Sequence, residues 1–411
     1  MVRRGHRIDW ILQSEAPCRK SYRTSRCNCT VWVGKTDNGT SRWARLKKNV
    51  LHLIHSFLVF PLAHRNDYDF IQVKDPFLVA TVAMVAAKAT RKKFFYWMSF
   101  PIAESYLHAA RDGSARYPMI YRLRGAASRW LLYRVIMPRA DHVFVQSEQM
   151  KRDVMGEGIP PWKLTPVPTG VSIHMVNAGT TNFKQDRAVL PAPPSIVYLG
   201  TLVRVRKLDF LLRVFSMVLE EFPEVRLYLV GDGEDPEDAR FLQREARKLG
   251  ISDAVVFTGF LPRDQALRLV AKADVAVIPF YPTPILNSTS PNKLIEYMAL
   301  GKPVVANDHP EQRLIIEESG GGICVPYEEG AFARAILELM RDPTKAAEMG
   351  QKGRAYVLKH RTYPRIAQEL EHEYFRHSCH VPQEHFCFAD SWPQLEPHSS
   401  TNKYCPTKKA N

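Results

Sequence analysis

The sequence predicts an α/β fold in which parallel sheets are covered by helices on both faces. Short, continuously apolar runs alternate with amphipathic stretches at helical spacing, and glycines follow several of the apolar runs. A hydrophobic content of 45% over 411 residues is enough for two cores and for two or three domains. In such sheets ligands bind outside the carboxyl ends of the strands, so we expect the functional residues in the loops after the apolar runs.

The second half of the chain has the most regular alternation of strand and helix signals. An apolar run at 195–199 predicts a buried strand that ends at Gly200, and apolar residues between Leu208 and Leu219 recur at helical spacing. Further strands are expected at 225–230, 254–257, 275–279 and 304–306, with helices over 236–249 and 265–273. The ligand-binding edge of this sheet should carry the loop 280–290 and three glycines, Gly200, Gly231 and Gly259.

The first half gives similar but weaker signals, with expected strands at 69–73, 93–98 and 141–145 and an apolar helix over 77–89. Residues 177–194 are polar, then proline-rich, and lack periodicity, which predicts an interdomain linker. The expected organisation is an N-terminal domain at 1–176, this linker, a C-terminal domain at 195–360, a terminal helix at 361–376 and a mobile tail at 377–411.

The segment 290–300, with the sequence SPNKLIEYMAL, is the most informative part of the chain. Ser290 is a favourable N-cap, and Pro291 suits the first helical position. Lys293 then lies in the first turn, the wrong end of the helix dipole for a cation unless an anion such as a phosphate docks there. Glu296 follows on the same face, where its carboxylate could accept hydrogen bonds from sugar hydroxyls. The alternative is a capped surface helix with an incidental Lys–Glu pair.

A basic loop follows the first strand of this half and contains Arg204, Arg206 and Lys207. Three cations within four residues, at the ligand-binding edge of a sheet, suit a diphosphate. A solvated basic turn explains any one of them equally well. Together with Lys293 and the helix start, they favour an anion site.

Taken in order, these segments resemble the donor half of a glycosyltransferase. The run 195–375 is similar to the retaining, nucleotide-sugar-dependent enzymes of family four, the glycosyl transferases group 1, which have the GT-B fold. Besides the basic loop, the similar segments are LVGDG at 229–233, VFTGFLP at 256–262, ADV at 273–275 and the stretch 290–303. The resemblance implies two Rossmann-like βαβ domains that face each other across a cleft, with the helix 361–376 crossing back onto the first.

The resemblance also implies roles for individual residues. Lys207 and one of the arginines, Arg204 or Arg206, would hold the donor diphosphate, and Lys207 and Arg204 are the catalytic candidates on this side. Glu296 would bind the ribose hydroxyls, and backbone amides at the helix start would contact phosphate. The remaining expected donor-site residues are Gly200, Gly259, Phe260 and Leu261, the last three lining the base, and Ser288, Ser290, Asn292, Lys293 and Leu294.

The sequence departs from the family pattern at three places. Ser288 stands where the family has the first of two glutamates, a position that normally contacts the donor sugar, so the identity of the sugar is in doubt. Thr201 follows the strand glycine, where the family often has an arginine. No histidine follows the strand at 93–98 directly, and the candidates on the acceptor side are Glu104 and His108. An ordinary surface pair on a helix would have the same spacing of four.

The start of the chain is expected to be incomplete. Residues 4–9 resemble the end of the family's first helix running into its second strand. On that alignment the N-terminal acceptor-binding domain lacks its first strand, its glycine-rich acceptor loop and most of its first helix.

The expected function is transfer of a sugar from a UDP- or GDP-type nucleotide-diphosphate sugar to a sugar or lipid-linked acceptor hydroxyl, with retention, in polysaccharide, glycolipid or glycoconjugate synthesis. No cofactor and no metal are expected, because no cluster of metal ligands has a standard spacing. The seven cysteines, an odd number, do not suggest a disulfide framework. The alternative is a catalytically silent nucleotide-sugar-binding or scaffold protein derived from a truncated glycosyltransferase. The missing acceptor loop, the missing histidine and Ser288 favour it.

The net charge of +15, from 57 cations and 42 anions, indicates an anionic partner. We expect no nucleic acid, because no basic–aromatic module of a known type is present. An anionic membrane surface fits better, since Arg42, Arg45, Lys47 and Lys48 precede an apolar run at 50–62, and the stretch 116–134 mixes arginines with Trp130 and leucines. Amphipathic domain helices with a solvated face would give the same pattern. With no secretory signal and no apolar run of ~20 residues, we expect a cytoplasmic protein, peripheral at the inner membrane face.

Overall fold

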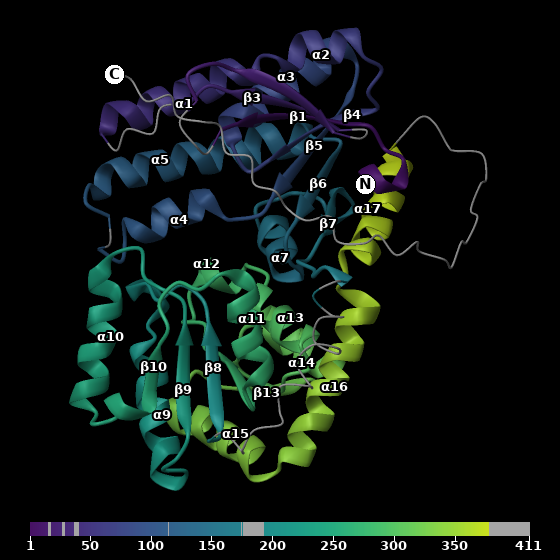
Figure 1. Cartoon of the computed structure of the whole chain (residues 1–411). Coiled ribbons are helices and arrows are strands. Elements are labelled where there is room, and N and C mark those ends of the chain that lie inside the picture. The colour runs from purple at the N-terminus through teal and green to yellow at the C-terminus, as the bar shows by residue number, and fades with distance from the viewer. Residues whose placement is uncertain are drawn as a thin grey trace, which may run out of the picture.

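The computed structural model describes residues 1–14, 18–26, 29–36, 41–113, 115–173, 175 and 193–377. The chain forms two α/β halves, one above the other in Figure 1, that are joined on one side by a long helical segment. The interdomain linker predicted at 177–194 lies outside the described residues except for its last two positions. The predicted tail at 377–411 lies outside them after His377.

The C-terminal half is built on a six-stranded sheet with the order β10-β9-β8-β11-β12-β13. Every strand pair in it is parallel, as the continuous apolar runs predicted. The strands are β8 (Ser195–Leu199), β9 (Arg226–Val230), β10 (Val255–Phe257), β11 (Val275–Ile278), β12 (Val304–Asn307) and β13 (Gly322–Val325).

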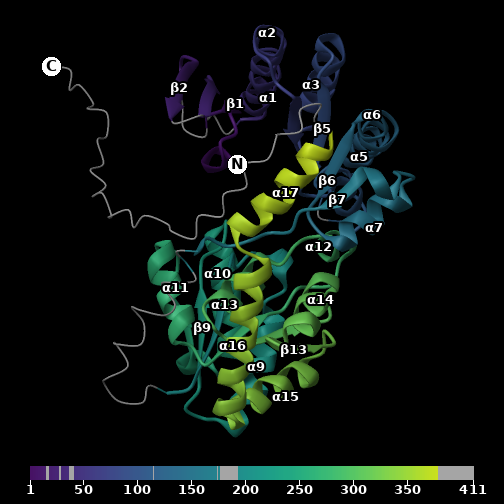
Figure 2. The ribbon, with the colours of Figure 1, turned by 90° about the vertical axis from the view of Figure 1, so that its right-hand side faces the viewer.

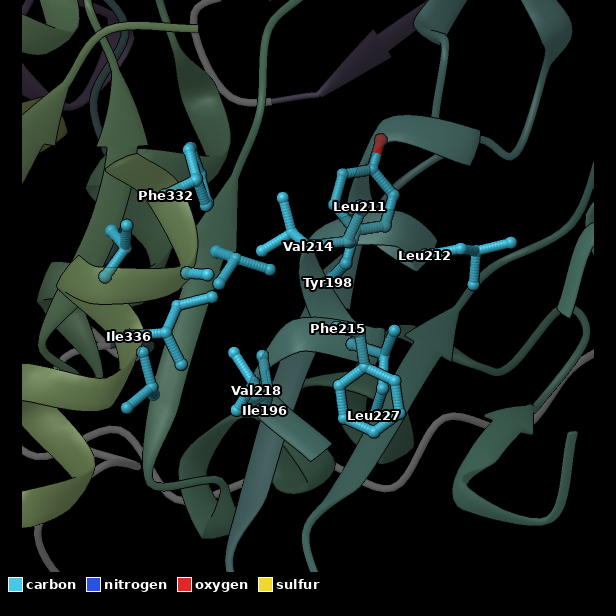
Figure 3. Packing of buried hydrophobic residues seen from close by; sticks show 14 of the residues in the cluster. Ile196, Tyr198, Leu211, Leu212, Val214, Phe215, Val218, Leu227, Phe332 and Ile336 are labelled. Carbon is cyan, nitrogen blue, oxygen red and sulfur yellow. The ribbon is translucent and has the colours of Figure 1, made fainter. Parts of the chain in front are cut away.

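Alternate residues of these strands pack under helices on opposite faces of the sheet. One face is covered by α9 (Asp209–Glu221), α10 (Pro236–Lys248) and α15 (Glu329–Arg341), whose apolar residues form one cluster with Ile196 and Leu227. Figure 3 shows Leu211 and Phe215 of α9 and Ile336 of α15 meeting in this cluster. The other face is covered by α11 (Arg263–Lys272), α13 (Asn292–Ala299), α14 (Pro310–Ser319) and α16 (Pro343–His360).

The N-terminal half contains two sheets. A parallel sheet of order β4-β5-β6-β7 is made of Phe70–Lys74, Lys93–Met98, His142–Val145 and Leu164–Pro166. A separate sheet has the order β1-β3-β2, with β1 (Ile8–Gln13) parallel and β2 (Tyr22–Arg26) antiparallel to β3 (Cys29–Gly34). The Tyr68 hydroxyl donates to the Asp9 carboxylate between them. The absence of the family's first strand from this domain stays a prediction.

Helices flank the N-terminal sheets. The apolar helix α3 (Phe77–Thr90) packs against β4 and β5, and α1 (Arg42–Ser56) packs against β1 and α3. The π-helical segment η2 (Leu131–Ile136) continues α5 inward, with Leu132, Tyr133 and Ile136 buried. The remaining helices are α2 (Val59–Arg65), α4 (Ile102–Ala109), α5 (Pro118–Trp130), α6 (Met137–Arg139) and α7 (Glu148–Gly156).

The chain crosses between the halves twice, and the two crossings pair. The amide of Val171 donates to the carbonyl of Arg361 at 2.8 Å, and the amide of Tyr363 donates to the carbonyl of Val171 at 3.0 Å. After this bridge, α17 (Tyr363–His377) lies on the four-stranded sheet of the N-terminal half, as the resemblance implied (Figures 1 and 2). Its apolar face packs against Phe95 and Phe144 through Ile366, Leu370 and Tyr374.

Most predicted elements are present with ends shifted by one or two residues, and the strands at 93–98 and 195–199 match to the residue. One cap was wrong. The helix predicted from Ser290 begins at Asn292, and no side chain caps it. The Ser290 hydroxyl instead accepts a hydrogen bond from the amide of Thr169 at 3.3 Å, so the tertiary partner replaces the local one.

Gly231 gives a test of the packing at the strand ends. Its φ is 138°, and a Cβ atom there would lie 2.0 Å from the carbonyl oxygen of Gly200. Gly231→Ala should therefore destabilise the C-terminal half by about 3 kcal/mol, because strain and overlap act together. Thermal unfolding followed by circular dichroism measures the loss. Gly330→Ala, within helix α15, is the control and should not destabilise. Equal stability of both variants would contradict the packing described.

Candidate functional site

The carboxyl ends of β8, β9 and β10 meet at one edge of the C-terminal sheet, at three glycines. The amide of Gly200 donates to the carbonyl of Val230 at 3.0 Å, and Gly231 forms an isolated β-bridge with Gly259. Both Gly231 and Gly259 have positive φ, at 138° and 64°. The close approach of Gly231 to Gly200 and the positive φ of Gly259 explain these glycines, which leave main-chain atoms rather than side chains at the ends of the strands.

The basic loop places its three cations differently. Lys207 follows the short helix η5 (Arg204–Arg206) with a left-handed backbone at φ 52°, a conformation that costs energy for any residue with a side chain. Arg206 extends toward β11, with its Cζ 5.5 Å from the ring centroid of Phe280. Arg204 turns to α10, where its Cζ lies 4.8 Å from the ring centroid of Phe241. Of the two arginines, Arg206 is therefore the one directed toward the loop after β11.

Helix α13 brings Lys293 and Glu296 together as predicted. The Nζ of Lys293 lies 2.8 Å from Oε2 of Glu296, and the Nη2 of Arg263 lies 3.1 Å from Oε1 of the same carboxylate. The Glu296 side chain is 14% exposed, so its carboxylate is fixed by the two cations and keeps a small accessible surface. Arg263 was not predicted from the sequence, because its position 33 residues before Glu296 gives no local signal.

Two backbone amides at the start of α13, which we expected to be available to a phosphate, already have hydrogen-bond acceptors. The amides of Asn292 and Leu294 donate to the carbonyls of Ser290 and Pro291, both at 3.1 Å. A phosphate that contacts these amides would have to share or replace those turn bonds. The side chain of Leu294 is fully buried, so any contact that this residue makes with a ligand runs through its backbone.

A buried tyrosine fixes α13 against the first strand of the sheet. The hydroxyl of Tyr297 accepts a hydrogen bond from the amide of Leu199 at 2.7 Å, and its ring is fully buried. Burial raises the pKa of this phenol well above its usual value, so it stays protonated. This bond ties α13 to the end of β8, the strand that the basic loop follows.

The loop between β11 and α13 is held from both halves of the molecule. Within the C-terminal half, His309 Nε2 lies 2.8 Å from the carbonyl of Leu286, and Asn307 Oδ1 accepts from the amide of Phe280 at 2.6 Å. From the N-terminal half, the hydroxyl of Ser147 donates to the carbonyl of Ser288 at 2.7 Å. Ser288, the residue at the family's glutamate position, is buried at this contact.

A second contact between the halves lies beside it. Oε1 of Glu311, near the start of α14, accepts hydrogen bonds from the amides of Glu148 and Gln149, at 2.8 and 3.4 Å. These amides are the first of α7, where the positive end of the helix dipole favours a carboxylate. Burial nevertheless raises the pKa of Glu311 above its ordinary value. The N-terminus of α7 is thus filled by a side chain of the other half.

The acceptor-side candidates do not meet. Both lie on α4, on the side of the N-terminal half that faces the C-terminal half (Figure 1). Glu104 turns inward and accepts a hydrogen bond from the Tyr133 hydroxyl at 2.9 Å, and burial raises the pKa of its carboxyl. His108 lies 3.4 Å from Asp112, on the exposed face of the helix.

Asp75 and Ser99 form a second polar pair, at the carboxyl ends of β4 and β5. Asp75 has a left-handed backbone at φ 64°, and its Oδ1 accepts from the amide of Ser99 at 2.6 Å. Its other oxygen accepts from the Ser99 hydroxyl. The pair was not predicted from the sequence, although an aspartate two residues after the strand expected at 69–73 was a usable signal.

The base-binding candidates lie after β10. Phe260 is 82% exposed, so its ring is accessible for stacking. Leu261 packs against the apolar cluster under α11 and α13.

A surface hollow of about 450 Å³ lies on the N-terminal half and is lined by 63–67 and 89–92. Since β4 and β5 begin beside it, it lies at the opposite edge of their sheet from Asp75 and Ser99.

Two family models match the chain. The model for glycosyl transferases group 1 matches residues 193–342, and the glycosyl transferase 4-like domain matches residues 1–170. These ranges fall in both halves described above and leave out the whole of α16 and α17.

Relatives and a solved structure agree with this assignment. A D-inositol 3-phosphate glycosyltransferase of Catenulispora acidiphila is 24% identical over 53% of this chain and 52% of its own length. A GDP-mannose-dependent phosphatidylinositol monomannoside mannosyltransferase of Mycolicibacterium smegmatis is 30% identical over 42% of this chain and 46% of its own length. The matched region thus spans about half of these relatives.

The fold is shared with Anabaena HepE, solved in complex with UDP, at a TM-score of 0.64 and 16% identity. The superposition covers 90% of this chain and 99% of that one. With two parallel-sheet halves joined by a crossover helix, and with both family models matched in chain order, the chain belongs to the glycosyl transferases group 1 and has the GT-B fold.

Proposed function

We propose that this protein transfers a sugar from a nucleotide-diphosphate sugar to an acceptor hydroxyl, with retention of configuration. The observation that carries the proposal is the grouping of Glu296, Lys293 and Arg263 on one fixed platform, behind the glycine-ended strands. A carboxylate held between two cations suits paired hydroxyls such as those of a ribose, and the neighbouring cations suit the diphosphate.

The chemistry rests on stabilising the leaving diphosphate, which carries the largest developing charge. Lys207 and Arg206 would supply positive charge from the loop after β8, and Lys293 would supply it from the start of α13. The left-handed backbone at Lys207 supports this role, because strained non-glycine residues cluster at functional sites. The donor would be of the UDP or GDP type, as in HepE, solved with UDP, and in the GDP-mannose-dependent relative.

The acceptor would enter from the N-terminal half. Asp75 and Ser99 lie at the carboxyl ends of its strands and are better candidates to bind an acceptor hydroxyl than Glu104 and His108, which diverge. We propose a sugar or lipid-linked acceptor, in line with the lipid named in the mycolicibacterial relative. A catalytically silent nucleotide-sugar-binding protein is the second candidate, supported by the burial of Ser288 against Ser147 where a sugar-contacting glutamate is expected.

A peripheral membrane site is proposed on α1. Its exposed apolar residues lie three or four positions apart and form one stripe, made of Trp43, Leu46, Val50, Ile54 and Phe57. Exposed Lys47 lies on the same helix. An apolar stripe beside cations suits an anionic bilayer surface at the inner membrane face. Among the described residues, no helix combines the length and the apolar character that a bilayer span requires.

Donor binding should depend on Lys207 and Glu296. Lys207→Ala and Glu296→Ala should each weaken the binding of UDP-glucose or GDP-mannose about tenfold or more, because each removes a charged partner of the ligand. Isothermal titration calorimetry on the full chain measures the dissociation constants. Lys248→Ala, on the exposed face of α10, is the control and should bind as the wild type does. Unchanged affinity in both site variants would reject the donor site.

Transfer should depend on the contact between Glu311 and α7. Glu311→Ala leaves two amides of α7 without an acceptor and should lower the rate of donor turnover about tenfold, while changing donor affinity less than twofold. Glu311→Gln keeps an acceptor oxygen and should retain most of the rate. Sugar release from the radiolabelled donor measures both variants. Equal rates for Glu311→Ala and the wild type would contradict a role for this contact.

Vesicle binding should depend on the stripe of α1. The double variant Trp43→Glu with Ile54→Glu should bind phosphatidylglycerol vesicles at least about tenfold more weakly. It loses two exposed apolar side chains that would insert into the bilayer, and it gains negative charge. Co-sedimentation measures the partition. Leu358→Glu, an equally simple change at an exposed apolar residue of α16, is the control. Absence of wild-type binding, or equal binding of all three proteins, would reject the site.

A further inference from the structure

Three potential metal ligands from two distant parts of the chain meet under the crossover helix. His142 is the first residue of β6, and Glu373 and His377 lie one turn apart on α17. Oε1 of Glu373 lies 3.7 Å from Nε2 of His142 and 3.7 Å from Nε2 of His377. One ligand atom from each residue can be chosen so that all three lie within 4.8 Å of one another.

The cluster is enclosed rather than solvated. The side chains of His142 and Glu373 are 1% and 11% exposed, and that of His377 is 26% exposed. The rings of Phe95 and Phe144 pack on His142 at centroid distances of 6.2 and 5.0 Å, so water has little access from the sheet side. Enclosure by aromatic rings is a usual surrounding for a structural metal site.

His142 carries an unexplained nitrogen. Its Nε2 lies 2.9 Å from the hydroxyl of Thr165, whereas its buried Nδ1 has no hydrogen-bond partner among the described residues. Nε2 is also the nitrogen that lies near Oε1 of Glu373, so it is the candidate ligand atom, and a bound ion would replace its contact with Thr165. An imidazole binds a given ion through one nitrogen, so an ion at Nε2 would leave Nδ1 without a partner.

Nearby cations set a limit on affinity but do not close the site. Nη1 of Arg376 donates to Oε2 of Glu373 at 3.2 Å, which leaves Oε1 directed between the histidines. The ammonium of Lys163 is occupied by the carbonyls of Pro138 and Ala140, at 2.7 and 2.8 Å. Lys151 lies near enough to act on His142 through its charge. These charges favour a moderate rather than a very tight metal site.

We propose that His142, Glu373 and His377 bind a divalent transition cation of the zinc type, with solvent completing the coordination. Two imidazoles and one carboxylate are a donor set that Zn²⁺ and Co²⁺ accept in tetrahedral geometry. Bonds of about 2.0–2.2 Å require ligand atoms roughly 3.3–3.6 Å apart, so the two 3.7 Å distances to Glu373 need only small side-chain movements. The two imidazoles would have to close any remaining gap between their nitrogens, because the ligand atoms lie within 4.8 Å of one another. No ion of this kind was expected from the sequence, because His142 lies more than 200 residues before Glu373 and His377.

The site would fasten the crossover helix to the N-terminal half. His142 is at the amino end of β6, away from the strand ends that carry Asp75 and Ser99, so the ion would act on structure rather than on the transferred sugar. Since α17 returns from the C-terminal half, a bond between β6 and α17 would resist separation of this helix from its sheet.

Cobalt titration of the metal-free full chain under reducing conditions tests the proposal. We expect one Co²⁺ per chain with the visible absorption of tetrahedral coordination and without thiolate charge-transfer bands. Glu373→Gln and His377→Asn should each weaken binding at least about tenfold. His372→Asn, at an exposed position on the same helix, should leave it unchanged. Circular dichroism of each variant confirms that it is folded.

Thermal unfolding provides a second readout. Zn²⁺ should raise the unfolding temperature of the wild type and of His372→Asn, and should not raise that of His377→Asn. The proposal is overturned if the wild type binds no Co²⁺, or if the Glu373 and His377 variants bind as the wild type does. It is also overturned if binding is lost on replacing His385 and Cys387, because the ion would then belong to the C-terminal residues.

Discussion

The pairing of the two chain crossings is the constraint on which the arrangement of the molecule depends. Val171 and Thr362 lie 191 residues apart, yet they form a single parallel bridge through which both connections between the halves pass. The packing there is too close for a side chain at Gly170, where a Cβ atom would lie 2.5 Å from Ile366. The hydrogen bonds from Ser147 to Ser288 and from α7 to Glu311 lie between the same two halves and join the loops that follow their strands.

Contacts within the C-terminal half fix the proposed donor site. Tyr297 joins α13 to the end of β8, and Arg263 and Lys293 fix the carboxylate of Glu296. The loop before α13 is held in addition by the N-terminal half, through Ser147. The position of this loop therefore depends on how the two halves sit together, whereas the carboxylate of Glu296 is held by its own half.

Periodicity predicted the fold well, because each buried strand and each amphipathic helix leaves a local signal. Strand 195–199 and the helix after it needed only the spacing of apolar residues. The site was predicted in part, through Lys293 and Glu296, which are neighbours on one helix. The Ser290 cap and the pairing of Glu104 with His108 were not found, because these side chains have partners distant in sequence. The amide of Thr169 donates to the hydroxyl of Ser290, and the hydroxyl of Tyr133 donates to the carboxylate of Glu104. No local pattern encodes such meetings, and the cluster under α17 was missed for the same reason.

The bridge at Val171 also marks where one half of the molecule ends and the other begins along the chain. The C-terminal half is an uninterrupted insertion whose two ends emerge side by side, while the N-terminal half is discontinuous and takes its last helix from the end of the described sequence. A recombination that exchanged everything between the two crossings would transplant the six-stranded sheet with its helices and leave the N-terminal core of the recipient intact. A break placed after α16 would instead remove Leu370 and Tyr374 from the core around Phe95 and Phe144, although these two phenylalanines lie more than 200 residues before the break.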